Sequence, residues 1–131
     1  MDKDNLSLLL IGMGAIGGVT AGFIKTAGYN IQAVCKYPDL AHHIQTKGIH
    51  VIGVRGEFHT PMPAVASVKE LKNTYDIIFL AVKTPDLMKM VADIKPLLKP
   101  TSSLVVMENG IIEDRLGEIF GAERVVGCIV G

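Results

Sequence analysis

The sequence has no excess of charge of either sign that would indicate a charged partner. Its 13 lysine and arginine residues are balanced by 13 aspartate and glutamate residues. Binding to nucleic acid or to an anionic membrane surface depends on a basic patch, and this balance does not supply one. We therefore expect no nucleic-acid and no membrane partner, and any bound anion has to be held by local geometry.

Long apolar runs are missing as well. The longest stretch of apolar residues and glycines, Leu8 to Val19, is shorter than the roughly 20 residues that a membrane helix needs. The opening Met-Asp-Lys-Asp-Asn has neither the basic nor the apolar segment of a signal peptide. Internal repeats and low-complexity linkers are absent, so the 131 residues indicate one domain.

Cysteine is scarce, and the spacings typical of metal ligands are absent. The two cysteines, Cys35 and Cys128, lie in strand-like runs, where we expect buried free thiols. A disulfide between them is left open. Free thiols are typical of the reducing cytoplasm, which is where we expect the protein. Because the sequence has no His-x3-His or Cys-x2-Cys spacing, we expect no metal site.

The sequence does contain a glycine-rich turn between an apolar run and a helical pattern. Residues 6–17 read Leu-Ser-Leu-Leu-Leu-Ile-Gly-Met-Gly-Ala-Ile-Gly. This pattern predicts a buried strand that enters a Gly-x-Gly-x-x-Gly turn. An amphipathic helix should follow and end at Gly28, and its apolar face should consist of Ile16, Val19, Phe23, Ile24 and Ala27. In this context the glycines are typical of a dinucleotide-binding turn rather than of a flexible loop.

Each glycine of the turn has its own physical task. Gly12 permits the tight turn, Gly14 lets the backbone approach a pyrophosphate, and Gly17 lets the helix pack close to the strand. The helix then offers unpaired N–H groups and a partial positive charge to the phosphates. The predicted cofactor-binding segment also includes Met13, Ala15 and Ile16.

Strand and helix patterns alternate along the rest of the chain. Further apolar runs predict strands, at 31–35, 75–82, 104–107 and 124–130. Helical patterns are found at 38–48, 84–95 and 111–120. Residues 49–65 predict an antiparallel hairpin with Gly56 in its turn. The predicted fold class is α/β: a doubly wound, Rossmann-type parallel sheet with helices on both faces and a small antiparallel hairpin insertion.

The helix expected at 84–95 has recognisable ends and one apolar stripe. Thr84 is its predicted N-cap, and Pro96 should end it. Its stripe is Leu87, Val91, Ile94 and Leu98.

Polar residues lie just past the ends of three of the predicted strands. Lys36 follows the run at 31–35, Lys83 follows Val82, and Asn109 follows the run at 104–107. Ligands bind outside the carboxyl ends of the strands in an open parallel sheet. We therefore expect these residues to meet the glycines at one crevice. The predicted cofactor-binding residues beyond the turn are Lys36, Val82, Lys83 and Asn109, with Lys83 and Asn109 also near the substrate.

Lys36 bears on the choice of cofactor. An NAD site usually carries an acidic residue about 20 positions past the glycines, bonded to the ribose hydroxyls. Here Cys35 and Lys36 end the second strand, and the first acidic residue is Asp39. An ammonium attracts the 2′-phosphate that a carboxylate would repel, so NADP(H) is favoured over NAD. The alternative is that Lys36 and Lys83 only reach water at the rim of the sheet.

The ordered set of segments resembles the N-terminal domain of the ketopantoate reductase family over nearly all 131 residues. The segments are Ile-Gly-Met-Gly-Ala-Ile-Gly-Gly, Val-Cys-Lys, Leu-Ala-Val-Lys-Thr, Glu-Asn-Gly and Phe-Gly-Ala-Glu-Arg-Val-Val-Gly. In that family the glycine turn binds NADPH, and the basic residue matching Lys36 contacts the 2′-phosphate. The residues matching Lys83 and Asn109 lie by the nicotinamide ribose and the substrate.

The resemblance implies a reductase that transfers a hydride from NADPH to 2-dehydropantoate, a 2-keto acid, giving (R)-pantoate for pantothenate and coenzyme A biosynthesis. The family's proton-donating lysine and a substrate-holding carboxylate lie in a C-terminal helical domain that no residue here matches. We therefore expect residues 1–131 to be the NADP-binding domain of a longer protein, without catalytic residues and inactive alone. Two departures are Glu108, where the family often has glutamine, and Lys36, which lacks the bidentate fork of arginine.

Two other readings stay open at this point. A regulatory nucleotide-sensing domain without catalysis shares the glycine turn, but such domains usually carry an acidic residue where this chain has Lys36. A remnant fold without a cofactor could serve as a structural or dimerising module, and a homodimer is left open.

Overall fold

The computed structural model describes residues 5–12, 14–53, 56–107 and 112–128. Its strands are β1 (Ser7–Ile11), β2 (Asn30–Val34), β3 (Ile49–Gly53), β4 (Gly56–Thr60), β5 (Ala64–Val65), β6 (Tyr75–Leu80), β7 (Leu98–Val106) and β8 (Val125–Gly127). Its α-helices are α1 (Ala15–Thr26), α2 (Pro38–Thr46), α3 (Thr84–Ile94) and α4 (Ile112–Phe120). Three 3-10 helices are η2 (Val68–Glu70), η3 (Lys95–Leu97) and η4 (Ala122–Arg124). None of the helices in these ranges is long and apolar enough to cross a membrane.

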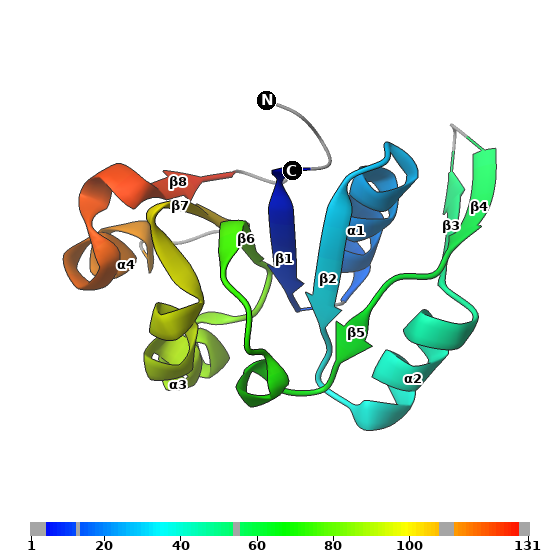
Figure 1. Ribbon diagram of the computed structural model, residues 1–131, viewed down its shortest axis with the longest axis horizontal. Helices are drawn as coiled ribbons and strands as arrows, with labels where there is room; N and C mark the ends of the chain where they lie inside the picture. The colour runs from blue at the N-terminus through cyan, green and yellow to red at the C-terminus, as the bar shows by residue number, and fades with distance from the viewer. Residues whose placement is uncertain (1–4, 13, 54–55, 108–111, 129–131) are drawn as a thin grey trace.

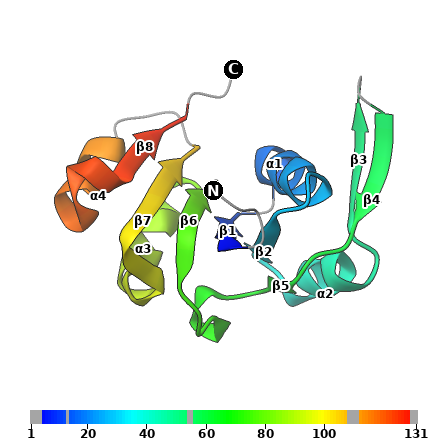
Figure 2. The same ribbon diagram turned by 45° about the horizontal axis from the view of Figure 1, so that its top comes forward.

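The main sheet has six strands in the order β5-β2-β1-β6-β7-β8 (Figure 1). Neighbouring strands in it run parallel. The hairpin β3–β4 forms a separate antiparallel sheet, which stands outside the main sheet beside α1 in both views (Figure 2). The predicted α/β fold with its hairpin insertion is confirmed.

The two faces of the sheet are covered by different helices. Along β1, Leu8 and Leu10 pack in one cluster with residues of α1 and α2. Leu9 and Ile11 pack in the other cluster, with residues of α3 and α4. A pleated strand sends successive side chains to opposite faces, so a strand that is apolar throughout has to lie between two helical layers. This explains the continuous apolar runs of the central strands.

The face that helix α1 turns to the sheet matches the predicted face only in part, because Ile24 packs against the core as expected. Val19 and Phe23, expected on the buried face, are 45% and 40% exposed. Among the α1 residues whose burial the structure describes, the buried ones are small: Gly17, Ala21 and Gly22. Small side chains let the helix axis come close to β1, and the larger apolar residues are thereby turned outward.

The ends of α3 differ from the prediction by small shifts. Lys83 is the N-cap residue and Thr84 is the first helical residue, so the predicted Thr84 cap is wrong by one position. Leu98, expected on the helix stripe, is the first residue of β7, because the 3-10 turn η3 with Pro96 ends the helix before it. Leu87 and Ile94 are buried as predicted.

Two further expectations need correction. The sheet gains an edge strand, β5, which pairs with β2 through two residues and was not predicted, because so short a run has no periodicity. Cys35 is buried, but Cys128 is exposed, contrary to the expected burial of both thiols, and both are free.

Asp76 connects β1 and β7 at the amino-terminal edge of the sheet. Its carboxylate accepts hydrogen bonds from the Ser7 amide at 2.8 Å and from the Lys99 ammonium at 2.9 Å. The Ser7 hydrogen bond, and after it the Lys99 side chain, lower the pKa of Asp76 from its usual 3.8. The charged carboxylate is therefore favoured in the folded state.

Replacing Asp76 with asparagine is expected to lower the free energy of unfolding by about 1 kcal/mol at neutral pH. Because the pKa is lower in the folded than in the unfolded state, the carboxylate stabilises the fold above its unfolded pKa and loses this effect as the pH falls through the folded pKa. Urea unfolding of both proteins should show the largest difference in the free energy of unfolding near pH 7, and this difference should become smaller as the pH is lowered. A difference that does not change with pH would contradict this role.

Candidate functional site

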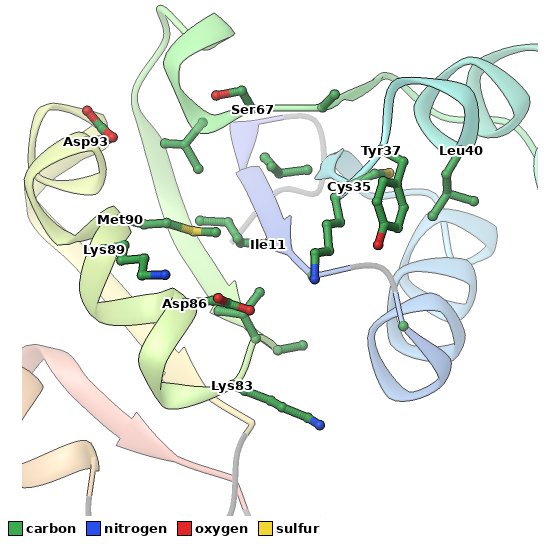
Figure 3. Close-up of a pocket in the computed structure, with 18 residues that line it drawn as sticks. Ile11, Cys35, Tyr37, Leu40, Ser67, Lys83, Asp86, Lys89, Met90 and Asp93 are labelled. Carbon is green, nitrogen blue, oxygen red and sulfur yellow. The ribbon is translucent and has the colours of Figure 1, made fainter.

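A pocket of about 600 Å³ lies at the carboxyl end of the main sheet (Figure 3). Its walls are built from residues at and just beyond the ends of β1, β2, β5 and β6, and from one face of α3. The sheet order changes direction here, since β2 lies on one side of β1 and β6 on the other. Such a switch point is where open parallel sheets bind ligands.

Backbone hydrogen bonds hold the strand ends together below the pocket. The Gly12 amide donates to the carbonyl of Val34 at 3.0 Å, and the Ala81 amide donates to the carbonyl of Ile11 at 2.8 Å. These bonds continue the ladder one residue past β1 and β6. The loops that form the pocket wall therefore start from fixed positions.

Gly12 and Gly17 are required by the chain itself. Gly12 has φ 104°, and a β-carbon there would lie 2.6 Å from the carbonyl oxygen of Ala81. A β-carbon at Gly17 would overlap the carbonyl oxygen of Gly12. Both contacts are with backbone atoms, which cannot rotate away as a side chain can. The two glycines let the turn and α1 pack against the strand ends.

Gly14 is different, because the described protein atoms do not require a glycine there. It is the N-cap of α1 with φ −82° and ψ −163°, a conformation that any residue adopts. Among the residues that the structure describes, no heavy atom outside the immediate neighbours of Gly14 lies within 4 Å of the position of a β-carbon. Within the described residues, the first turn of α1 has no acidic side chain and no side-chain cap from Gly14. The positive end of the helix therefore borders open space at the pocket.

Charged side chains line the pocket from opposite walls. Lys36 lies just past the end of β2, and Lys83 lies at the start of α3, where Figure 3 shows its side chain. The exposed face of α3 adds Asp86, Lys89 and Asp93. Lysines thus outnumber aspartates, three to two, among the described lining residues. The pocket combines this small positive excess with the helix end, an arrangement suited to an anion.

Cys35 lines the pocket but is not suited to act as a nucleophile. Burial raises the pKa of its thiol from 9.0 to about 11. The thiol is therefore protonated at neutral pH, and a protonated thiol is a poor nucleophile.

Five of the residues predicted from the sequence lie together around the pocket, namely Gly12, Gly14, Lys36, Val82 and Lys83. Gly17 lies behind the turn, at the contact between α1 and β1. Ala15 and Ile16 begin α1. Met13, Glu108 and Asn109 lie outside the described residues.

Other lining residues were not anticipated from the sequence. On α3 they are Asp86, Lys89, Met90 and Asp93, and near α2 they are Tyr37 and Leu40. The spacing of the α3 residues, three, four and seven positions from the first, places them on one face of a helix. That spacing was a usable signal, but it is the polar counterpart of the apolar stripe and is typical of any solvated helix face.

Comparisons with known proteins agree with this architecture. The family model described as Ketopantoate reductase PanE/ApbA matches residues 8–131. The 2-dehydropantoate 2-reductase of Aquifex aeolicus is 26% identical over 122 residues, which cover 92% of this chain and 37% of that protein.

Solved structures of similar proteins include a 2-dehydropantoate 2-reductase from Methylococcus capsulatus. It matches with a TM-score of 0.77 and 25% identity, over 95% of this chain and 40% of its own. A ternary structure of D-mandelate dehydrogenase with NADH and anilino(oxo)acetate matches with a TM-score of 0.81 and 23% identity, over 92% of this chain and 39% of its own. The chain thus spans well under half of these relatives. Because the family model extends over almost its whole length, the chain belongs to the ketopantoate reductase family.

Proposed function

We propose that this chain is the NADP(H)-binding domain of a cytoplasmic oxidoreductase that reduces a 2-keto acid, specifically 2-dehydropantoate to (R)-pantoate in pantothenate and coenzyme A biosynthesis. The observation that carries the proposal is that Gly12, Gly14, Lys36 and Lys83 line one pocket at the carboxyl end of the sheet. Membership of the ketopantoate reductase family supports a reductase domain over a regulatory nucleotide-sensing domain.

The residues around the pocket fit a nicotinamide dinucleotide. The open space beside Gly14 gives a diphosphate access to the N–H groups at the start of α1. The ammonium of Lys83, which precedes α3, can bond a ribose hydroxyl or an anionic group of the substrate. Asn109 is proposed as the second polar group near the substrate. When bound, NADPH supplies the hydride that reduces the keto group.

Lys36 is the residue that we propose to select NADPH. It directly follows Cys35 at the end of β2, where an NAD site usually places a carboxylate. Its ammonium attracts a 2′-phosphate as a point charge, without the two parallel hydrogen bonds of an arginine. The D-mandelate dehydrogenase of similar fold was solved with NADH, so the two cofactors have to be compared directly.

The proposal assigns only the cofactor half of an active site to these residues. The chain spans 32% to 39% of the length of three curated 2-dehydropantoate 2-reductases that it matches. We propose that the groups that hold the keto acid and donate the proton come from a domain outside residues 1–131. The 131 residues alone should therefore bind cofactor but turn over substrate poorly.

Titration with NADPH and NADH tests the proposal. The fluorescence of the reduced nicotinamide is convenient, because the chain has no tryptophan. We expect NADPH to bind at least about tenfold more tightly than NADH, which corresponds to about 1.4 kcal/mol. Lys36→Glu should weaken NADPH more than NADH, because only NADPH carries the 2′-phosphate.

Lys47→Glu is the matched control for this experiment. Lys47 is an exposed lysine at the end of α2 and is not among the residues that line the pocket. The Lys47→Glu substitution makes the same change in net charge as Lys36→Glu and should leave the preference for NADPH unaltered. Equal affinity for the two cofactors would refute the role of Lys36, and binding of neither would refute the proposed function.

A further inference from the structure

Tyr37 is the one aromatic residue among the described residues that line the pocket. It directly follows Lys36 and is the N-cap residue of α2, with extended backbone angles. The residue is 60% exposed. So exposed a ring contributes little to the core, although it stands at the mouth of a pocket.

The surroundings of the ring suit a flat, partly apolar ligand. The Lys36 ammonium lies 5.8 Å from the ring centroid, close to the limit of about 6 Å for a cation–π contact. In Figure 3 the Tyr37 ring lies beside Leu40, which is itself 37% exposed. At this distance from an exposed ring the ammonium is held weakly and can move to another partner.

Resting on the NADP(H)-binding function proposed above, we propose that the Tyr37 ring is the stacking surface for the adenine base of the cofactor. On binding, the Lys36 ammonium leaves the ring for the 2′-phosphate, and the base takes its place. Adenine is a flat aromatic system, and nucleobases stack through their π-faces on aromatic side chains such as that of tyrosine.

The order of the residues matches the chemistry of the ligand. In NADPH the base is attached to C1′ and the extra phosphate to C2′ of the same ribose, so the two groups are neighbours. Tyr37 and Lys36 are neighbours in the chain, with α-carbons about 3.8 Å apart. One ribose can therefore place its base on the ring and its 2′-phosphate at the ammonium. The apolar side chains of Met90 and Val68 also line the pocket and can contact the base.

Two substitutions of Tyr37 separate stacking from other roles. Tyr37→Ala should weaken NADPH and NADH by the same factor, about 5- to 150-fold, because both carry adenine. Tyr37→Phe keeps the ring and should bind both cofactors like the unaltered protein. Lys36→Gln is the contrast, because it should weaken NADPH alone. Since Tyr37 is exposed, thermal unfolding of both Tyr37 variants should match that of the unaltered protein.

The outcomes distinguish this inference from the function on which it rests. If the unaltered chain binds neither cofactor, the proposed function fails. If it binds NADPH and Tyr37→Ala binds equally well, the ring is not the stacking surface, although the proposed function stands. A loss for NADPH alone in Tyr37→Ala would assign the ring to positioning Lys36 and overturn the inference. Failure of Tyr37→Phe to restore binding would overturn it too.

Discussion

Replacing Gly17 with alanine is expected to lower the free energy of unfolding by about 3 kcal/mol or more. The new β-carbon would overlap the carbonyl oxygen of Gly12 and lie 3.1 Å from the side chain of Leu10. Alanine in a helix otherwise stabilises relative to glycine by up to about 1 kcal/mol. The sign of the effect therefore depends on how closely α1 approaches the end of β1, and the geometry predicts a loss.

Gly18→Ala is the matched control, one position further along the same helix. Apart from its chain neighbours and the helix backbone, no heavy atom of the described part of the chain lies within 4 Å of a β-carbon at Gly18. This variant should gain about 0.5–1 kcal/mol. Urea unfolding of both variants measures the difference. If Gly17→Ala were as stable as Gly18→Ala, the close contact between α1 and β1 described here would be wrong.

The layered architecture could be predicted because the strands have strong local signals. The run 75–82 is apolar on both faces, which indicates a central parallel strand, and β6 does lie between β1 and β7. Parallel strands then bring their carboxyl ends to one edge, so the sequence alone predicts that Lys36 and Lys83 share one crevice, and both do line the pocket.

The contact face of α1 could not be predicted in this way. Hydrophobic periodicity gives weight to large apolar residues, so Val19 and Phe23 were expected inside. The helix instead packs through Gly17 and Ala21, because close approach to the strand depends on small size and not on hydrophobicity. For a helix that follows a glycine-rich turn, the spacing of small residues predicts the buried face better than the spacing of large apolar residues.

Several other residues that line the pocket could not be predicted from the sequence either. The residues just after β5 belong to it only because a two-residue strand pairs with β2. In the sequence, Tyr37 precedes a proline that starts a helix. This position explains its extended backbone but gives no reason to expect an aromatic ring at the pocket. Its place beside Lys36 becomes meaningful only when the pocket is known.

Replacing Gly14 with valine is expected to abolish binding of both NADPH and NADH, a loss of at least about 100-fold, with little change in stability. The backbone at Gly14 is extended, and a β-carbon there meets no heavy atom of the described, non-adjacent residues within 4 Å. The chain can therefore accept a side chain, apart from about 1 kcal/mol for a poor N-cap residue. A diphosphate can no longer bind, however, because the valine side chain fills the space through which the diphosphate reaches the N–H groups of α1.

The contrast between Gly14 and Gly17 separates what the fold needs from what the ligand needs. Gly17→Ala should lose stability, whereas Gly14→Val should lose binding and unfold nearly as the unaltered protein does. Gly18→Val controls for a β-branched residue in α1, because Gly18 has equally open surroundings but does not line the pocket. It should keep its affinity for NADPH. If Gly14→Val also kept that affinity, the diphosphate would lie away from the end of α1, and the proposed orientation of the cofactor would have to be abandoned.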